Sequence, residues 1–85
     1  MKTYNGHRSW NAWNVSLWIG NDEPLYNLAI QKRDKALIKF KDKNRAAGAA
    51  ARWFIQAIGI GSKTPDGASY NQLSVKLAML GLMDE

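Results

Sequence analysis

The clearest pattern in the sequence is an apolar stripe between residues 47 and 58 that has the spacing of one face of an α-helix. Most members of the stripe are small: Ala47, Ala50, Ala51, Phe54, Ala57 and Ile58. Gly59 and Gly61 follow directly, and glycine commonly ends a helix. No segment alternates apolar and polar residues for long enough to predict a sheet. We therefore expect an all-α protein with one helix that ends at Gly59.

A short helix is predicted near the start of the chain. The Ser9 hydroxyl can cap a helix that begins at Trp10, and Gly20 and Asn21 are typical of its end. Five residues share one side of this helix and are expected to face the core: Trp10, Trp13, Asn14, Leu17 and Trp18.

A second helix is predicted from Asp22, Glu23 and Pro24 to about Phe40. Acidic residues and proline are favoured in the first turn of a helix. The expected apolar face consists of Leu25, Leu28, Ala29, Ala36 and Phe40. The polar stretch 42–45 is expected to separate this helix from the alanine-rich one.

The last third of the chain contains a turn and a fourth predicted helix. Residues 64–67 read T-P-D-G, which is typical of a type I turn. Ser69 followed by Gln72 predicts a capping box at the start of the helix. Leu73, Lys76, Leu77 and Leu80 have helical spacing and continue as this fourth helix. Together these segments predict a small bundle of about four helices.

The length of 85 residues predicts one small domain over residues 1–85, with residues 1–8 irregular. The chain has no cysteine, so disulfides and thiolate sites are excluded. The sequence contains no apolar run of the roughly 20 residues that a spanning helix needs, and its polar start does not resemble a signal peptide. We expect a cytoplasmic protein with no membrane partner.

The residues that could carry chemistry do not form a catalytic pattern. His7 is the only histidine, and no metal-binding partners stand at the required spacing around it. Asp22 and Glu23 are adjacent, so on a helix they point in different directions. Residues 59–64 lack the glycine that a phosphate-binding loop needs before its lysine. We therefore expect no enzyme activity, no metal and no cofactor.

The positive charge of the chain is concentrated in its centre. The chain has a formal net charge of +5, while residues 31–53 contain eight basic and two acidic side chains, which leaves −1 for the rest. Six basic residues are the candidate partner-binding group: Lys32, Arg33, Lys35, Lys39, Lys41 and Lys43. A basic section over residues 32–45 could contact the phosphates of a nucleic acid or an acidic protein surface, or form an ordinary solvated face.

Tryptophan is the second unusual feature. Three of the four tryptophans, Trp10, Trp13 and Trp18, lie within nine positions. The first expectation is that they are core anchors, because each ring buries a large area. The alternative is that one or two are partly exposed and form a protein-binding hot spot or the seam of a homo-oligomer.

Two segments resemble a family of small uncharacterised proteins encoded by phages and plasmids. Residues 4–6 read Y-N-G and residues 10–23 read W-N-A-W-N-V-S-L-W-I-G-N-D-E, close to the family pattern N-[WY]-E-T-W-N-V-x-L-W-I-x-N-D-E. The T-P-D-G turn is similar to the family's T-x-D-G. Asn11 and Ala12 replace the usual glutamate and threonine. The resemblance implies a phage or mobile-element origin, where small accessory proteins often bind and inhibit host machinery.

The sequence therefore predicts a non-enzymatic binding protein that inhibits or modulates a host protein, with host defence as one candidate target. The expected contact surfaces are the basic helix and the helix with Trp10, Trp13 and Trp18. Nucleic-acid binding through the basic section is the main alternative, and a self-assembling structural module is a further one.

Overall fold

Four helices follow one another in the computed structural model, which describes residues 9–84: α1 (Trp10–Asn21), α2 (Glu23–Lys39), α3 (Lys43–Ile58) and α4 (Gln72–Met83). Residues 59–71 form a loop in which Lys63 and Ser69 make an isolated antiparallel bridge. No strand forms in this part of the chain, so the all-α prediction is confirmed. Residues 1–8, which we expected to be irregular, lie outside the described residues.

Each of the first three helices begins after a polar residue that caps it, and each cap lies at or close to the helix start that the sequence predicts. Ser9 caps α1, and Asp22 caps α2, in which proline occupies the first turn. Asp42 caps α3 by accepting hydrogen bonds from two backbone amides at 2.7 and 3.2 Å. Because Asp42 satisfies these donors, α3 begins at Lys43. The separation between α2 and α3 is residues 40–42, not the predicted 42–45.

The predicted cap of α4 is wrong. Asn71, and not Ser69, caps this helix, because its Oδ1 accepts a hydrogen bond from the Ser74 amide at 2.9 Å. The capping box of Ser69 and Gln72 does not form. Ser69 is held elsewhere, since its amide donates to Oδ1 of Asn11 at 2.8 Å.

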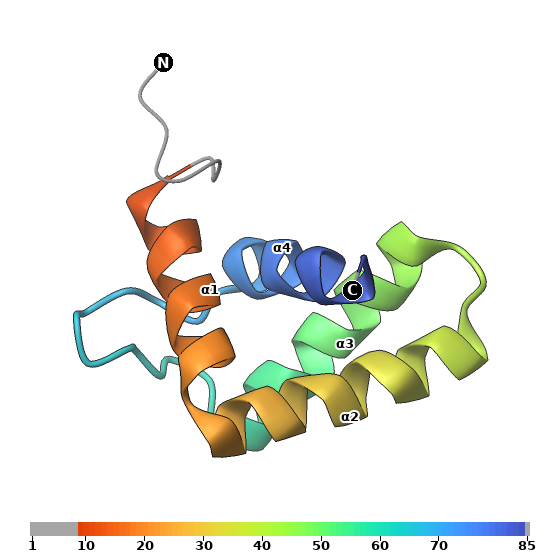
Figure 1. The fold of residues 1–85 in the computed structure, drawn as a ribbon, viewed down its shortest axis with the longest axis horizontal. Coiled ribbons are helices and arrows are strands. Elements are labelled where there is room, and N and C mark those ends of the chain that lie inside the picture. Colours follow the sequence, from red (N-terminus) through yellow and green to blue (C-terminus); the bar gives the residue numbers. More distant parts are fainter. Residues whose placement is uncertain (1–8, 85) are drawn as a thin grey trace.

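α3 lies at the centre of the arrangement and packs against both α2 and α4 (Figure 1). α2 and α3 run in opposite directions and are joined at one end of the molecule by residues 40–42 (Figure 1). α1 stands at the other end, against α4 and the start of α2. This order places the α2–α3 connection far from α1.

The alanine side of α3 supplies the largest share of the core. Its buried residues are Ala46, Ala47, Ala49, Ala50, Ala51 and Phe54. Alanine side chains are short, so neighbouring helices can approach closely. The Phe54 ring lies 6.1 Å from the ring of Tyr70, in a tilted arrangement. Ala57, which we expected on this face, is exposed because the buried side of the last turn passes through Phe54 and the half-buried Ile58.

The predicted core face of α1 is wrong except for Asn14. The residues that α1 buries are Ala12, Asn14, Val15 and Ile19. Trp10 and Leu17 are each 39% exposed. Trp13 and Trp18 are half-buried and stand outside the hydrophobic core cluster, so these three tryptophans are not the expected core anchors.

The helical spacing of Leu73, Lys76, Leu77 and Leu80 does not mark the buried side of α4. α4 buries Ser74, Val75, Ala78, Met79 and Leu82, whereas Leu73 is exposed. This helix has apolar residues on nearly every side, so periodicity alone does not select a face. A hydrogen bond from Nδ2 of Asn11 to the Ser74 hydroxyl at 2.6 Å fixes which side turns toward α1.

No helix within residues 9–84 is both long enough and apolar enough to cross a bilayer.

Gly48 provides a test of the α3 packing. A methyl group at this position would meet only Nε2 of Gln72, at an ordinary 3.9 Å, so no neighbour requires glycine there. We expect Gly48→Ala to raise the free energy of unfolding by about 0.5–1 kcal/mol, because glycine is unfavourable inside a helix. Urea denaturation followed by circular dichroism measures this change.

Gly59→Ala is the matched comparison. Gly59 has φ of 102°, a conformation that residues with a Cβ rarely adopt. The same glycine-to-alanine change should there lower the free energy of unfolding by about 1–2 kcal/mol. Equal changes in the free energy of unfolding for Gly48→Ala and Gly59→Ala would contradict the positive φ of Gly59 and the helical position of Gly48.

Candidate functional site

Two cations of the basic section are engaged in contacts with the rest of the fold. Nη1 of Arg33 donates to the Leu82 carbonyl at 2.8 Å, and Nη2 pairs with Asp34 at 2.9 Å. Arg33 therefore ties α2 to the end of α4. Lys43 pairs with Asp84 at 3.2 Å, but both side chains are largely exposed, so the pair is worth only about 0–1 kcal/mol.

Two other lysines lie over aromatic rings. Nζ of Lys35 is 4.8 Å from the centre of the Trp53 ring, and Nζ of Lys39 is 5.6 Å from the centre of the Phe40 ring. Both lysines are exposed, as is Lys41, whereas Lys32 is half-buried. Cation–π contacts restrain an ammonium group without neutralising its charge. Positive charge is thus held beside the Trp53 ring on α3 and the Phe40 ring at the end of α2.

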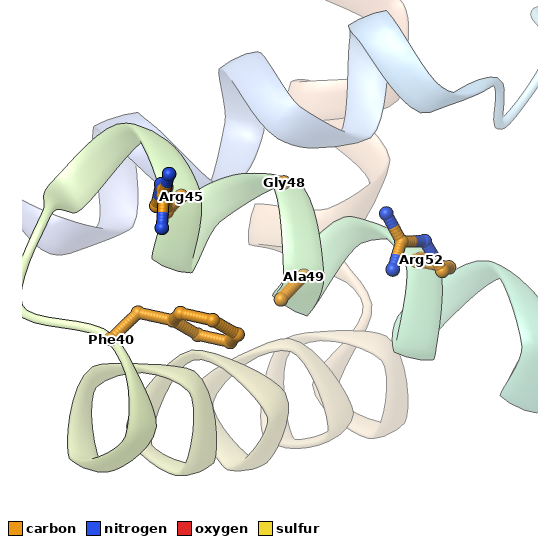
Figure 2. Close-up of a pocket in the computed structure, with 5 residues that line it drawn as sticks. All are labelled: Phe40, Arg45, Gly48, Ala49 and Arg52. Carbon is orange, nitrogen blue, oxygen red and sulfur yellow. The ribbon is translucent and has the colours of Figure 1, made fainter.

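A groove of about 380 Å³ lies between the end of α2 and the outer side of α3. Its lining consists of Phe40, Arg45, Gly48, Ala49 and Arg52, and we call it the Arg45–Arg52 groove. Figure 2 shows the Phe40 ring beneath Ala49, with the two arginines on either side. Neither guanidinium makes an ion pair within residues 9–84.

The two arginines join the lysines in one basic surface. Arg52 is adjacent to Trp53, over which Lys35 lies, and Phe40 is shared by Lys39 and the groove. We define the basic face as Lys35, Lys39, Lys41, Arg45 and Arg52. Arg45 ends the predicted basic section 32–45, but neither it nor Arg52 is among the six residues predicted to bind a partner. Their separation of seven positions on one helix was the signal that could have identified them.

Ile38 is a second feature that the sequence analysis missed. It lies in the last turn of α2, three residues after Lys35 and one before Lys39, and its side chain is 88% exposed. The preceding residue, Leu37, is 38% exposed. A large aliphatic side chain therefore projects into solvent beside the basic face.

The tryptophan helix and the basic face form two separate surfaces. Trp10, Trp13 and Leu17 stand on the outer side of α1, at the opposite end of the molecule from the α2–α3 connection (Figure 1). The structure does not bring these two predicted contact regions together.

Trp18 and its neighbour Asn14 instead fasten the loop of residues 59–71. Nδ2 of Asn14 and Nε1 of Trp18 donate to Oδ2 of Asp66, at 2.9 and 3.0 Å. The buried Thr64 hydroxyl donates to Oδ1 of Asn14 at 2.6 Å and accepts a hydrogen bond from the Ala68 amide. The two motifs of the resemblance, on α1 and in the T-P-D-G turn, are therefore one hydrogen-bonded unit.

Asn11 makes the second polar link between α1 and this loop. Its side chain donates to the Ser69 carbonyl at 2.9 Å and accepts from the Ser69 amide at 2.8 Å. Asn11, which departs from the pattern of the resemblance, therefore has a structural role in this fold. Within the described residues, no buried side-chain nitrogen or oxygen is left without a hydrogen-bond partner.

No group of three or more His, Cys, Asp or Glu side chains that could hold a metal ion occurs in residues 9–84. His7, which we expected to be a solvated loop histidine, lies outside this range.

The Asp66 contacts generate a pH-dependent prediction. Hydrogen bonds from Asn14, and secondarily from Trp18, hold the pKa of the Asp66 carboxyl below its ordinary value of 3.8. The carboxylate therefore stabilises the fold fully above that value, and its contribution is lost as the pH falls through the lower folded-state pKa. NMR titration of the carboxyl carbon should give a pKa below 3.8 in the wild-type protein.

Two variants separate the contributions of the donors. We expect the pKa of Asp66 to rise in Trp18→Phe and to rise further in Asn14→Ala. Asn14→Ala should also lower the free energy of unfolding by about 1–3 kcal/mol, because the buried Thr64 hydroxyl loses its acceptor. An unchanged pKa in both variants would show that these hydrogen bonds do not act on Asp66.

No curated protein and no solved structure matches the chain. A family model does match, and it covers residues 1–85. Membership of an uncharacterised family agrees with the resemblance found in the sequence. The chain belongs to the family of unknown function DUF7249.

Proposed function

We propose that this chain is a non-enzymatic accessory protein of a phage or mobile genetic element that binds a host protein and inhibits or modulates it. The resemblance to phage- and plasmid-encoded proteins supports this origin. The basic face with Ile38 is the contact surface, and an acidic protein surface is the partner. The observation that carries the proposal is the 88% exposure of Ile38 beside the basic face.

No lysine or arginine of the basic face pairs with a carboxylate within residues 9–84. Asp34 pairs with Arg33, and Asp42 accepts two backbone hydrogen bonds at the start of α3. The ammonium groups of Lys35 and Lys39 lie over aromatic rings, which do not cancel their charge. A surface of this kind attracts an acidic partner and orients it during encounter.

Ile38 favours a protein partner over a nucleic acid. Phosphates gain nothing from an aliphatic side chain, and binding to a nucleic-acid backbone depends on cations. A protein can offer an apolar pocket, and burial of an exposed isoleucine there contributes about 1.5–3 kcal/mol. Charged residues around a buried apolar anchor are the usual arrangement of a binding hot spot and its rim.

Ile60 provides a matched control for Ile38. It is 86% exposed but lies in the loop after α3, outside the basic face. We would immobilise the wild-type chain, Ile38→Ser and Ile60→Ser, and pass nuclease-treated bacterial lysate over each. We expect a host protein that the wild type and Ile60→Ser retain, and that Ile38→Ser binds about tenfold more weakly or worse.

Titration with the purified host protein gives the dissociation constants. Equal affinity of Ile38→Ser and the wild type would contradict the proposed surface, and recovery of no protein would contradict the proposed function. Recovery that disappears with nuclease treatment would favour nucleic-acid binding. In that case, affinity for single-stranded or duplex DNA or RNA should fall steeply with salt concentration.

A further inference from the structure

We infer that the Arg45–Arg52 groove receives a partner helix that carries two carboxylates seven residues apart with an apolar side chain between them. This inference rests on the proposed function and specifies the chemistry of the partner. It is carried by the spacing and freedom of the two arginines and by the apolar floor between them.

The two arginines form a pair of fixed separation. Arg45 and Arg52 are seven residues apart on α3, which corresponds to about 10.5 Å along the helix axis. Positions seven apart differ by only about 20° around the helix, so both side chains leave the same side. Both are exposed, and neither has a carboxylate partner among the described residues.

The space between the arginines is apolar and shallow. Phe40 and Ala49 form its floor, and Gly48 adds no side chain to the lining. The Gly48 carbonyl is held by Nε2 of Gln72 at 2.9 Å, and an added methyl group would meet no close neighbour. Packing within the fold therefore does not require glycine at position 48. Because Gly48 has no side chain, nothing projects from this position into the groove.

A helix with acidic residues at positions i and i+7 matches this surface. Its carboxylates have the same rise of about 10.5 Å, and each can pair with one guanidinium through two hydrogen bonds. An apolar residue at i+3 or i+4 then falls between them, over Phe40 and Ala49. The contact resembles the recognition of an amphipathic helix by a groove.

A nucleic-acid strand matches less well. Phosphates of one duplex strand follow one another about every 3.4 Å along the axis, so further phosphates would lie above the apolar floor between the arginines. Burying charge against Phe40 and Ala49 without a partner is unfavourable.

The test uses the full chain and two synthetic helical peptides of identical composition. The first has glutamate at i and i+7 with leucine at i+3 and i+4, and the second has the later glutamate moved to i+5, on another side of the helix. Chemical shifts of the ¹⁵N-labelled protein report binding. We expect saturable shifts at the amides of the groove residues Phe40, Arg45, Gly48, Ala49 and Arg52 with the first peptide, and affinity about tenfold lower with the second.

Two double variants remove equal charge at different places. Arg45→Gln with Arg52→Gln should weaken binding of the first peptide by about tenfold or more. Lys63→Gln with Lys76→Gln, outside the basic face, should leave the affinity within about twofold, since distant exposed charges are screened. Spectra of the free variants should match the wild type away from the substitutions, because no described contact depends on either guanidinium.

The outcomes separate this inference from the proposed function. Absence of saturable shifts in the groove, equal binding of both peptides, or full binding by the arginine variant would overturn the inference. Tighter binding of a single-stranded oligonucleotide than of the first peptide, at the same amides, would also overturn it. If the arginine variant retained the host protein that Ile38→Ser loses, the inference would fail while the proposed function would stand.

Discussion

Close packing of α2 and α4 against the alanine side of α3 is the interaction on which the rest of the structure depends. Five alanines and Phe54 are buried on that side, so α3 is covered by both neighbours. The same packing leaves the opposite edge of α3 in solvent, where Arg45 and Arg52 project. A bulkier buried face would hold the helices farther apart and change the shape of the groove beside Phe40. The core and the candidate binding surface are therefore two sides of one helix.

Polar contacts, and not burial of the tryptophan rings, determine how α1 joins this core. Asn11 and Asn14 bind the loop before α4, and Trp18 adds an indole hydrogen bond to Asp66. These bonds set the rotation of α1, so that Ala12, Val15 and Ile19 enter the core. Of the three spaced tryptophans on α1, Trp18 thus has a structural role. The outer side of α1 exposes Trp10 and Leu17, and α1 stands at the opposite end of the molecule from the α2–α3 connection (Figure 1).

The basic section illustrates how a fold sorts charges that look equivalent in a sequence. Arg33 is used to hold the end of α4, and Lys43 pairs with Asp84. Arg45 and Arg52 keep their guanidiniums without carboxylate partners in the described part of the chain. The net charge of this section thus indicated where a binding surface would lie. Which side chains form that surface depends on which cations have hydrogen-bond or ion-pair partners elsewhere in the fold.

The sequence by itself determined the helices, their approximate ends, the basic section and the family. These features are local, because a cap such as Asp42 acts on amides two or three residues away and the end at Gly59 depends on its own backbone conformation. Only the tertiary structure decided which sides of α1 and α4 are buried, which cations are free and that Ile38 is exposed. Burial depends on helices that are distant in sequence. When a helix is apolar on several sides, its neighbours, and not its own periodicity, decide which side is covered.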